Sequence, residues 1–288
     1  MNHRQALWGL HISAVAFGLT GVFGKLALAS AAVVVFGRAC FAVLSLLVVA
    51  GRARDRRLPS PRQLAWLGLA GLALGGHWLT FFHAVKLAGV AIGTLGFASF
   101  PAFTVLLEAV VFRERIRATE WALVALVTGG LLLVTPPAQA GSALGTGLAW
   151  AVLSGFLFSV YSLMSRVSAG KLHPAQTAMW QNVAIALVLL PVVWTQLPQV
   201  RAMDWFWMAM LGVFCTGVAH SIFVGSLSVL KARTASMFFA LEPVYGIAIA
   251  WVLFHERPTP LMLVGGLLII AAIALTSLRK APEPAAAA

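Results

Sequence analysis

Residues 97–101 read FASFP and are followed by FRER at 112–115, while residues 239–243 read FALEP and are followed by FHER at 254–257. Each matched pair of positions is 142 residues apart. A proline, two phenylalanines and a glutamate-arginine pair shared at fixed spacing exceed what chance similarity between apolar segments produces. The chain therefore contains an internal repeat, and this repeat decides the fold.

The composition around the repeat is that of an integral membrane protein. Of the 288 residues, 61% are hydrophobic and 10% are charged, whereas a soluble globular protein has about 25% charged residues. A helix needs about 20 apolar residues to cross a bilayer. Runs of that kind predict ten spans at residues 5–24, 33–50, 63–84, 90–111, 119–135, 144–165, 175–195, 204–228, 234–254 and 260–278.

The repeat divides these spans into two halves. We expect a first five-helix repeat over 1–137, a second over 143–280 and a disordered tail over 281–288. Because each half has an odd number of spans, the second half is inverted relative to the first. The expected fold is an all-α polytopic membrane protein with ten transmembrane helices in two inverted five-helix repeats, which is typical of transporters.

The formal net charge of +12 is explained by topology. Basic residues concentrate in cytoplasmic loops. Four of them fall in the loops on one side (Lys25, Lys86, Arg201 and Arg257), and fifteen fall on the side that holds both termini. The fifteen are Arg4, Arg52, Arg54, Arg56, Arg57, Arg62, Arg113, Arg115, Arg117, Arg166, Lys171, Lys231, Arg233, Arg279 and Lys280. Both termini are therefore predicted in the cytoplasm, the lipid bilayer is the partner, and no nucleic-acid partner is expected.

Other function classes lack their motifs. The chain has no phosphate-binding G-x-x-x-x-G-K-[ST] loop, no H-E-x-x-H and no G-x-S-x-G. Its two cysteines and its histidines lack metal-ligand spacing. We therefore expect no enzyme activity, no cofactor and no metal. A passive channel is the alternative, but its continuous polar lining does not match the sparse polar residues within these spans.

The chain resembles the drug/metabolite transporter superfamily, in the family with two EamA-type five-helix repeats. The resemblance is carried by a first span ending in Lys25, by Arg38-Ala39 opening the second span, and by the paired proline and Phe-x-Glu-Arg segments. It is closest to the YddG-type aromatic amino-acid exporters. The resemblance implies a bacterial inner-membrane protein that exports amino acids or related metabolites through a central cavity.

Ionisable groups at membrane depth are candidates for function. Glu242 is expected near the midplane, where it either binds the substrate's ammonium group, accepts a proton or packs as a protonated side chain. Arg38 is expected to lie shallow on the outer side, and it either contacts carboxylates or satisfies helix ends. His77 and Trp78 are expected near the midplane of the third span and are candidate substrate contacts.

Aromatic residues at inner depths are the other candidates, because concave sites are largely apolar with few polar groups. They are Phe97, Phe100, Phe158, Tyr161 and Phe239. Pro101 and Pro243 occupy the same place in the two repeats and are predicted as hinges, with static kinks as the alternative, on the expectation that each removes a hydrogen bond within a helix. Two glycine pairs, Gly71/Gly75 and Gly89/Gly93, are expected to pack the third span against the fourth.

The function predicted from the sequence is export of aromatic or neutral amino acids, or of similar small amphipathic metabolites, by alternating access around a central cavity. Export of threonine/homoserine or of drug-like compounds is the alternative. Proton exchange, substrate exchange and facilitated diffusion are all compatible with the sequence. The repeat does not require an oligomer.

Overall fold

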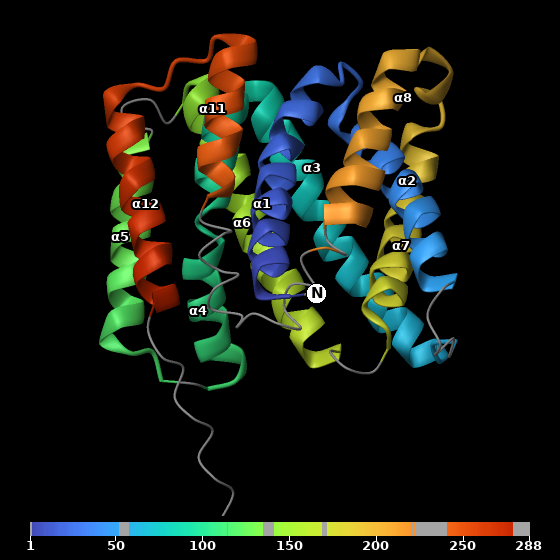
Figure 1. The fold of residues 1–288 in the computed structure, drawn as a ribbon, viewed down its shortest axis with the longest axis horizontal. Helices are drawn as coiled ribbons and strands as arrows, with labels where there is room; N and C mark the ends of the chain where they lie inside the picture. Colours follow the sequence, from blue (N-terminus) through green and yellow to red (C-terminus); the bar gives the residue numbers. More distant parts are fainter. Residues whose placement is uncertain are drawn as a thin grey trace, which may run out of the picture.

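The computed structural model describes residues 2–51, 58–113, 115–134, 141–168, 172–219, 222 and 241–278. Most of these residues form helices that run roughly parallel to one another in a bundle (Figure 1). The first half contains α1 (His3–Leu26), α2 (Ala31–Gly51), α3 (Pro61–Phe97), α4 (Phe100–Val111) and α5 (Ala118–Val134). The second half contains α6 (Ala143–Ser168), α7 (Pro174–Val193), a 3₁₀ turn η2 (Leu197–Gln199), α8 (Ala202–Ala209), η3 (Met210–Val218), α11 (Glu242–Phe254) and α12 (Pro260–Leu278).

Among the residues that the structure describes, five helices are long and apolar enough to cross a membrane by length and composition. They cover Arg4–Leu26, Ala31–Val49, Pro61–Phe97, Ala143–Ser165 and Ala175–Val193. The shorter apolar helices include α4, α5, α11 and the segment Ala202–Val218, in which α8 continues directly into the π-helical η3. The predicted spans 204–228 and 234–254 lie partly outside the described residues.

Helix α3 is too long for one span. Its 37 residues would extend about 55 Å at 1.5 Å per residue, but it bends at Gly89, which has φ 88° and ψ 171°. A left-handed φ is readily adopted only by glycine, so a single glycine turns the chain. This glycine lies in the gap predicted between spans 63–84 and 90–111, although the chain stays helical as far as Gly89.

The predicted span 90–111 is also interrupted. Helix α3 ends at Phe97 and α4 begins at Phe100, with Ala98 and Ser99 forming a turn between them. The Ser99 hydroxyl donates to the Gly96 carbonyl oxygen at 2.7 Å, so a side chain satisfies a backbone group at the break. The fourth span is thus a discontinuous helix.

Matching hydrogen bonds tie each half to the other. Ser13 Oγ on α1 donates to the carbonyl oxygen of Ala219 at 2.9 Å. Ser154 Oγ on α6 donates to the carbonyl oxygen of His77 at 3.2 Å. Ser13 and Ser154 are 141 positions apart, and His77 and Ala219 are 142 positions apart, which is within one residue of the offset of the sequence repeat. The first helix of each half therefore makes the same contact with the opposite half.

The close approach of helices repeats in the same way. A Cβ on Gly18 of α1 would lie 2.9 Å from the Glu242 carbonyl oxygen of α11. At the repeat-related positions, Ser159 Oγ of α6 donates to the Phe100 carbonyl oxygen of α4 at 2.7 Å. Figure 1 shows α1 beside α11 and α6 beside α4 near the centre of the bundle.

Polarity is distributed as a bilayer requires. Large apolar side chains face outward, with Leu187 65%, Leu267 66% and Val252 74% exposed. Polar side chains are buried instead, among them Arg38, His77, Gln181, Asn182 and Asp204. Lipid tails can cover the outward side chains, while the buried polar groups need partners inside the protein.

Candidate functional site

An aromatic cluster lies where the two halves meet. The His77 ring of α3 is 4.9 Å from the Phe97 ring and 5.0 Å from the Phe158 ring of α6, measured between ring centroids. Phe100 of α4 lies 5.2 Å from Phe97 and 5.1 Å from Phe158. Tyr161 extends the cluster, 5.7 Å from Phe158. Five of the eight predicted substrate residues are therefore in one cluster.

Small residues on α6 allow this cluster to form. A Cβ on Gly155 would lie 2.7 Å from Ser99 Oγ and 3.0 Å from the Phe97 carbonyl oxygen, so α6 contacts the break between α3 and α4 directly. At the preceding residue of α6, Ser154 Oγ lies 2.7 Å from His77 Nδ1. The imidazole orientation is thus set by a hydroxyl group of the opposite half.

Trp78, the sixth predicted residue, stacks against the positively charged Arg38 side chain. The guanidinium carbon of Arg38 lies 3.9 Å from the Trp78 ring centroid and 5.9 Å from that of Phe82. Arg38 is 5% exposed, and its Nε donates to Thr216 Oγ1 at 3.1 Å. The expectation that Arg38 is shallow is wrong, because its long side chain is held by residues in the middle of α3 and η3.

Close backbone packing holds Arg38 in place. A Cβ on Gly212 of η3 would lie 2.5 Å from the Arg38 carbonyl oxygen, so α2 and η3 touch. The Thr216 hydroxyl donates to the Leu211 carbonyl oxygen, five residues earlier, at 2.9 Å. π-Helical segments are rare and frequently lie at functional sites. The sequence does not reveal η3, because Thr216 is a single hydroxyl-bearing residue in an otherwise apolar run.

Glu242 begins α11, beside the middle of α1, where its carbonyl oxygen approaches Gly18. It interacts electrostatically with Arg38. Phe239, the eighth predicted residue, lies outside the described residues. The structure therefore sets Glu242 near the Arg38 group and leaves Phe239 as a prediction.

Helix α7 adds two buried amides to the site. Gln181 and Asn182 are each 1% exposed. Tyr161 Oη donates to Gln181 Oε1 at 3.4 Å, which connects the aromatic cluster to α7. Gln181 also lies against Gly71, whose Cβ would be 2.6 Å from the Gln181 carbonyl oxygen. Gly71 and Gly75 thus pack α3 against α7, and their predicted role between spans three and four is wrong.

The two predicted hinge prolines occupy equivalent positions. Pro101 is the second residue of α4, and Pro243 is the second residue of α11. A proline there costs no hydrogen bond, because the first N–H groups of a helix have no partner within it. The expectation that each proline removes a hydrogen bond within a helix is therefore wrong. Both prolines mark the start of a helical segment, and their hinge role stays a prediction.

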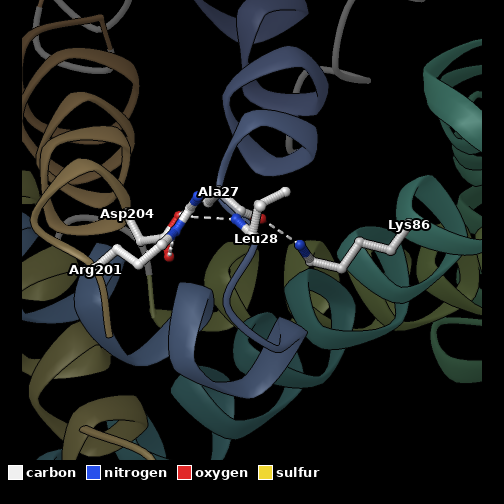
Figure 2. A network of polar contacts seen from close by, with 5 residues as sticks. All are labelled: Ala27, Leu28, Lys86, Arg201 and Asp204. Carbon is white, nitrogen blue, oxygen red and sulfur yellow. Dashed lines mark hydrogen bonds and ion pairs between the residues drawn. The ribbon is translucent and has the colours of Figure 1, made fainter. Parts of the chain in front are cut away.

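Charged residues close the end of the bundle opposite the N-terminus. Figure 2 shows Asp204 of α8 accepting from the Leu28 N–H at 2.8 Å and pairing with Arg201 at 2.8 Å. The hydrogen bonds that Arg201 donates to the Asp204 carboxylate raise the pKa of Arg201. On the other side of this loop, Lys86 of α3 donates to the Ala27 carbonyl oxygen. The turn after α1 is thus held from both sides.

A second ion pair lies at the same end. Lys25 of α1 pairs with Glu256, and its Nζ lies 4.8 Å from the Phe254 ring centroid. The other carboxylate oxygen of Glu256 accepts from the Val90 N–H at 2.9 Å, next to the Gly89 bend. Glu256 therefore joins α1, α3 and α11.

A pocket of about 510 Å³ lies at the opposite end of α1. Its lining residues are Asn2, Arg4, Gln5, Trp8, Gly9, Ile12 and Ile222. None of the predicted substrate residues lines it. Within the described part of the chain, no three His, Cys, Asp or Glu side chains are grouped as a metal site would require.

The helical bundle, its inverted symmetry and the polar groups buried at its centre define a membrane transporter. The chain matches the EamA-like transporter family over residues 4–135 and again over 145–278. It belongs to that family, and the predicted all-helical fold with two repeats is confirmed.

Named relatives are transporters as well. The chain is 29% identical over 286 residues to the "Probable terminal-alkyne amino-acid exporter" of Streptantibioticus cattleyicolor, covering 94% of this chain and 90% of the relative. It is 26% identical over 226 residues to the "Threonine/homoserine exporter RhtA" of Escherichia coli, covering 76% and 71%. A solved crystal structure matches the fold with a TM-score of 0.65 and 21% identity, covering 97% of this chain and all 100% of that one.

Proposed function

We propose that the protein exports aromatic or neutral amino acids, or similar small amphipathic metabolites, by alternating access. The observation that carries this proposal is the cluster of His77, Phe97, Phe100, Phe158 and Tyr161 at the junction of the two halves. Apolar surface with few polar groups suits a small amphipathic solute. Two relatives named as amino-acid exporters support the same substrate class.

The construction of the cluster supports movement of the halves. Its rings come from α3 and α4 of the first half and from α6 of the second, so a displacement between halves changes the site. Pro101 lies at the start of α4, which contributes Phe100 to the cluster. Pro243 lies at the start of α11, next to Glu242. We propose that these two breaks act as hinges, and that transport needs neither a cofactor nor covalent chemistry.

The charge distribution supports the orientation. We propose that both termini lie in the cytoplasm and that the protein resides in a bacterial inner membrane, because fifteen loop cations against four follow the positive-inside rule. The end closed by Lys25–Glu256 and Arg201–Asp204 is then the outer end. In this arrangement the solute enters from the cytoplasmic end.

Threonine/homoserine or drug-like compounds are the second candidate. The likeness to the threonine/homoserine exporter favours threonine and homoserine as substrates. The four aromatic rings clustered with His77 instead favour a substrate with a more apolar side chain. A small hydroxylated side chain would leave the faces of those rings unused.

Uptake by purified full-length protein in liposomes tests the proposal. Labelled phenylalanine, leucine, threonine and homoserine are offered separately, with protein-free liposomes as the control. We expect uptake of phenylalanine above leucine and of both above threonine. Uptake of threonine and homoserine alone would favour the second candidate, and absence of all four would refute amino-acid transport.

A further inference from the structure

We propose that the Arg38 guanidinium is a binding site for the carboxylate of the transported solute. The proposal deepens the amino-acid export proposed above, because it assigns the group that recognises the acid end of the substrate. It also predicts a broader ligand class, namely small aromatic carboxylates with or without an amino group.

The guanidinium is held rigidly in the protein interior. Its face lies on Trp78 at 3.9 Å, and its Nε donates to Thr216 at 3.1 Å. These contacts fix the plane of the group and the direction of its remaining N–H groups. A guanidinium whose geometry is fixed before binding matches a carboxylate with two parallel hydrogen bonds.

The fixed group retains unused donor capacity. Arg38 Nη1 is buried and has no hydrogen-bond partner among the residues that the structure describes. The ion pairs found among those residues are Lys25–Glu256 and Arg201–Asp204, and neither includes Arg38. A buried charged donor without an acceptor is costly, so the site favours an incoming anionic oxygen. Glu242 contributes only a longer-range attraction.

An independent observation comes from α7. Gln181 corresponds to Arg38 in packing, because a Cβ on Gly71 would lie 2.6 Å from the Gln181 carbonyl oxygen and one on Gly212 would lie 2.5 Å from the Arg38 carbonyl oxygen. Gln181 Nε2, a donor, and Asn182 Oδ1, an acceptor, are buried without a partner among the described residues. Helices α2 and α7, which pack against each other, thus both present unused polar atoms.

The aromatic cluster links these two helices. Arg38 stacks on Trp78, the neighbour of His77 in the sequence. Gln181 accepts a hydrogen bond from Tyr161, whose ring lies beside that of Phe158. A solute that carries a carboxylate, an N–H donor and an apolar side chain can satisfy Arg38, the α7 amides and the rings together. An α-amino acid with a large side chain has these three parts.

The test measures ligand-induced thermal stabilisation of the purified full-length protein. The probes are phenylalanine, phenylacetate, phenylalaninamide and phenethylamine, which differ in whether they carry a carboxylate. We expect the first two to bind the wild type at least about tenfold more tightly than the last two, as expected for a charge-assisted pair. Arg38→Gln should abolish that preference, and the exposed-arginine control Arg62→Gln should keep it.

A second variant covers the case in which Arg38→Gln does not fold. Thr216→Val removes the group that orients Nε but keeps the side-chain shape. It should weaken binding of the two carboxylates by about threefold or more, with binding of the amide and the amine unchanged. A wild type that shows no preference for carboxylates, or variants that retain it in full, would overturn the Arg38 site.

The two proposals fail in different ways. Amino-acid uptake with an unchanged carboxylate preference in Arg38→Gln would refute the Arg38 site and leave the proposed function standing. Arg38-dependent binding of phenylacetate without uptake of any amino acid would retain the site and refute amino-acid export.

Discussion

Phe97 packs against several rings in and beside the aromatic cluster. Its ring lies within 6.0 Å of the rings of His77, Phe81, Phe100 and Phe158. Because Phe97 closes α3 immediately before the break, it belongs both to the packed core and to the surface that the proposed substrate meets. A variant at this position separates aromatic recognition from general packing.

We predict that Phe97→Leu lowers kcat/KM for phenylalanine by about three- to tenfold while that for leucine changes less, since an aromatic pair contributes about 0.5–1.5 kcal/mol beyond area burial. The substitution keeps an apolar side chain, so the protein should fold. The measurement is the ratio of the two kcat/KM values in proteoliposomes. The control is Phe206→Leu on the outward face of α8, where Phe206 is 51% exposed. An equal drop in kcat/KM for both amino acids in Phe97→Leu would contradict the prediction.

Single residues were predictable where their chemistry was visible in the chain. His77, Phe97, Phe100, Phe158 and Tyr161 were selected as aromatic or titratable groups at inner depth, and the structure brings them together. Arg38 was misplaced because its contacts depend on α3 and η3, which lie far from it in the sequence. The positions of Gln181 and Gly71 likewise follow from helix pairing, which local patterns do not encode.

The contact between α6 and the break after Phe97 is tight enough to be tested by one methyl group. A Cβ on Gly155 would lie 2.7 Å from Ser99 Oγ and 3.2 Å from the Phe100 nitrogen. We predict that Gly155→Ala lowers the free energy of unfolding by about 1–3 kcal/mol through overpacking, seen as a lower Tm in detergent.

Gly129→Ala on α5 is the matched control, because a Cβ there meets nothing within 4 Å. Alanine stabilises a helix relative to glycine by up to about 1 kcal/mol, so this variant should keep or slightly raise Tm. Equal Tm values for the two variants would show that α6 does not pack against the break as described.

The ion pair of Glu256 is the element that joins three helices at the closed end. Removing it should loosen that end and admit a thiol reagent to the interior. We predict that Glu256→Ala raises the rate of maleimide labelling of Cys215, which is 0% exposed, by about tenfold, in a background where Cys40 is replaced by alanine. Loss of a partly buried pair of this kind costs on the order of 1–2 kcal/mol.

Glu120→Ala provides the comparison for that experiment. Glu120 accepts from the Arg117 N–H at 2.7 Å at the start of its own helix and is not part of the closed end. Labelling of Cys215 should stay at the parental rate in this variant. If Glu256→Ala also labels at the parental rate, the ion pair does not hold the end closed.

Helix positions were predicted well from apolar runs, and helix breaks were not. The bounds of α2, α7 and α12 lie within a few residues of the predicted spans. The break at Ala98–Ser99 and the π-helical η3 escaped prediction, whereas the bend at Gly89 lies in the gap predicted between spans 63–84 and 90–111. Apolar composition continues through these places, and tertiary packing such as that of Gly155 and Gly212 decides where the helix departs from regularity.

The two halves are joined by contacts that repeat across the molecule. The pair Ser13–Ala219 and the pair Ser154–His77 are equivalent, but the polar groups of α2 and α7 are not, since Arg38 in one half corresponds to Gln181 in the other. In the proposed alternating access, the repeat is the symmetric frame that rocks and the asymmetric residues give the site its direction. The offset of about 142 residues made this frame predictable from the sequence alone.

Alternating access is the central claim, and counterflow in proteoliposomes tests it most directly. Liposomes containing the purified full-length protein are loaded with unlabelled phenylalanine and diluted into a trace of labelled phenylalanine. A carrier that exposes one site to one side at a time predicts faster, transient accumulation of label in the loaded vesicles than in empty ones. Label that enters loaded and empty vesicles at the same rate, together with unitary currents from the same protein, would contradict the account.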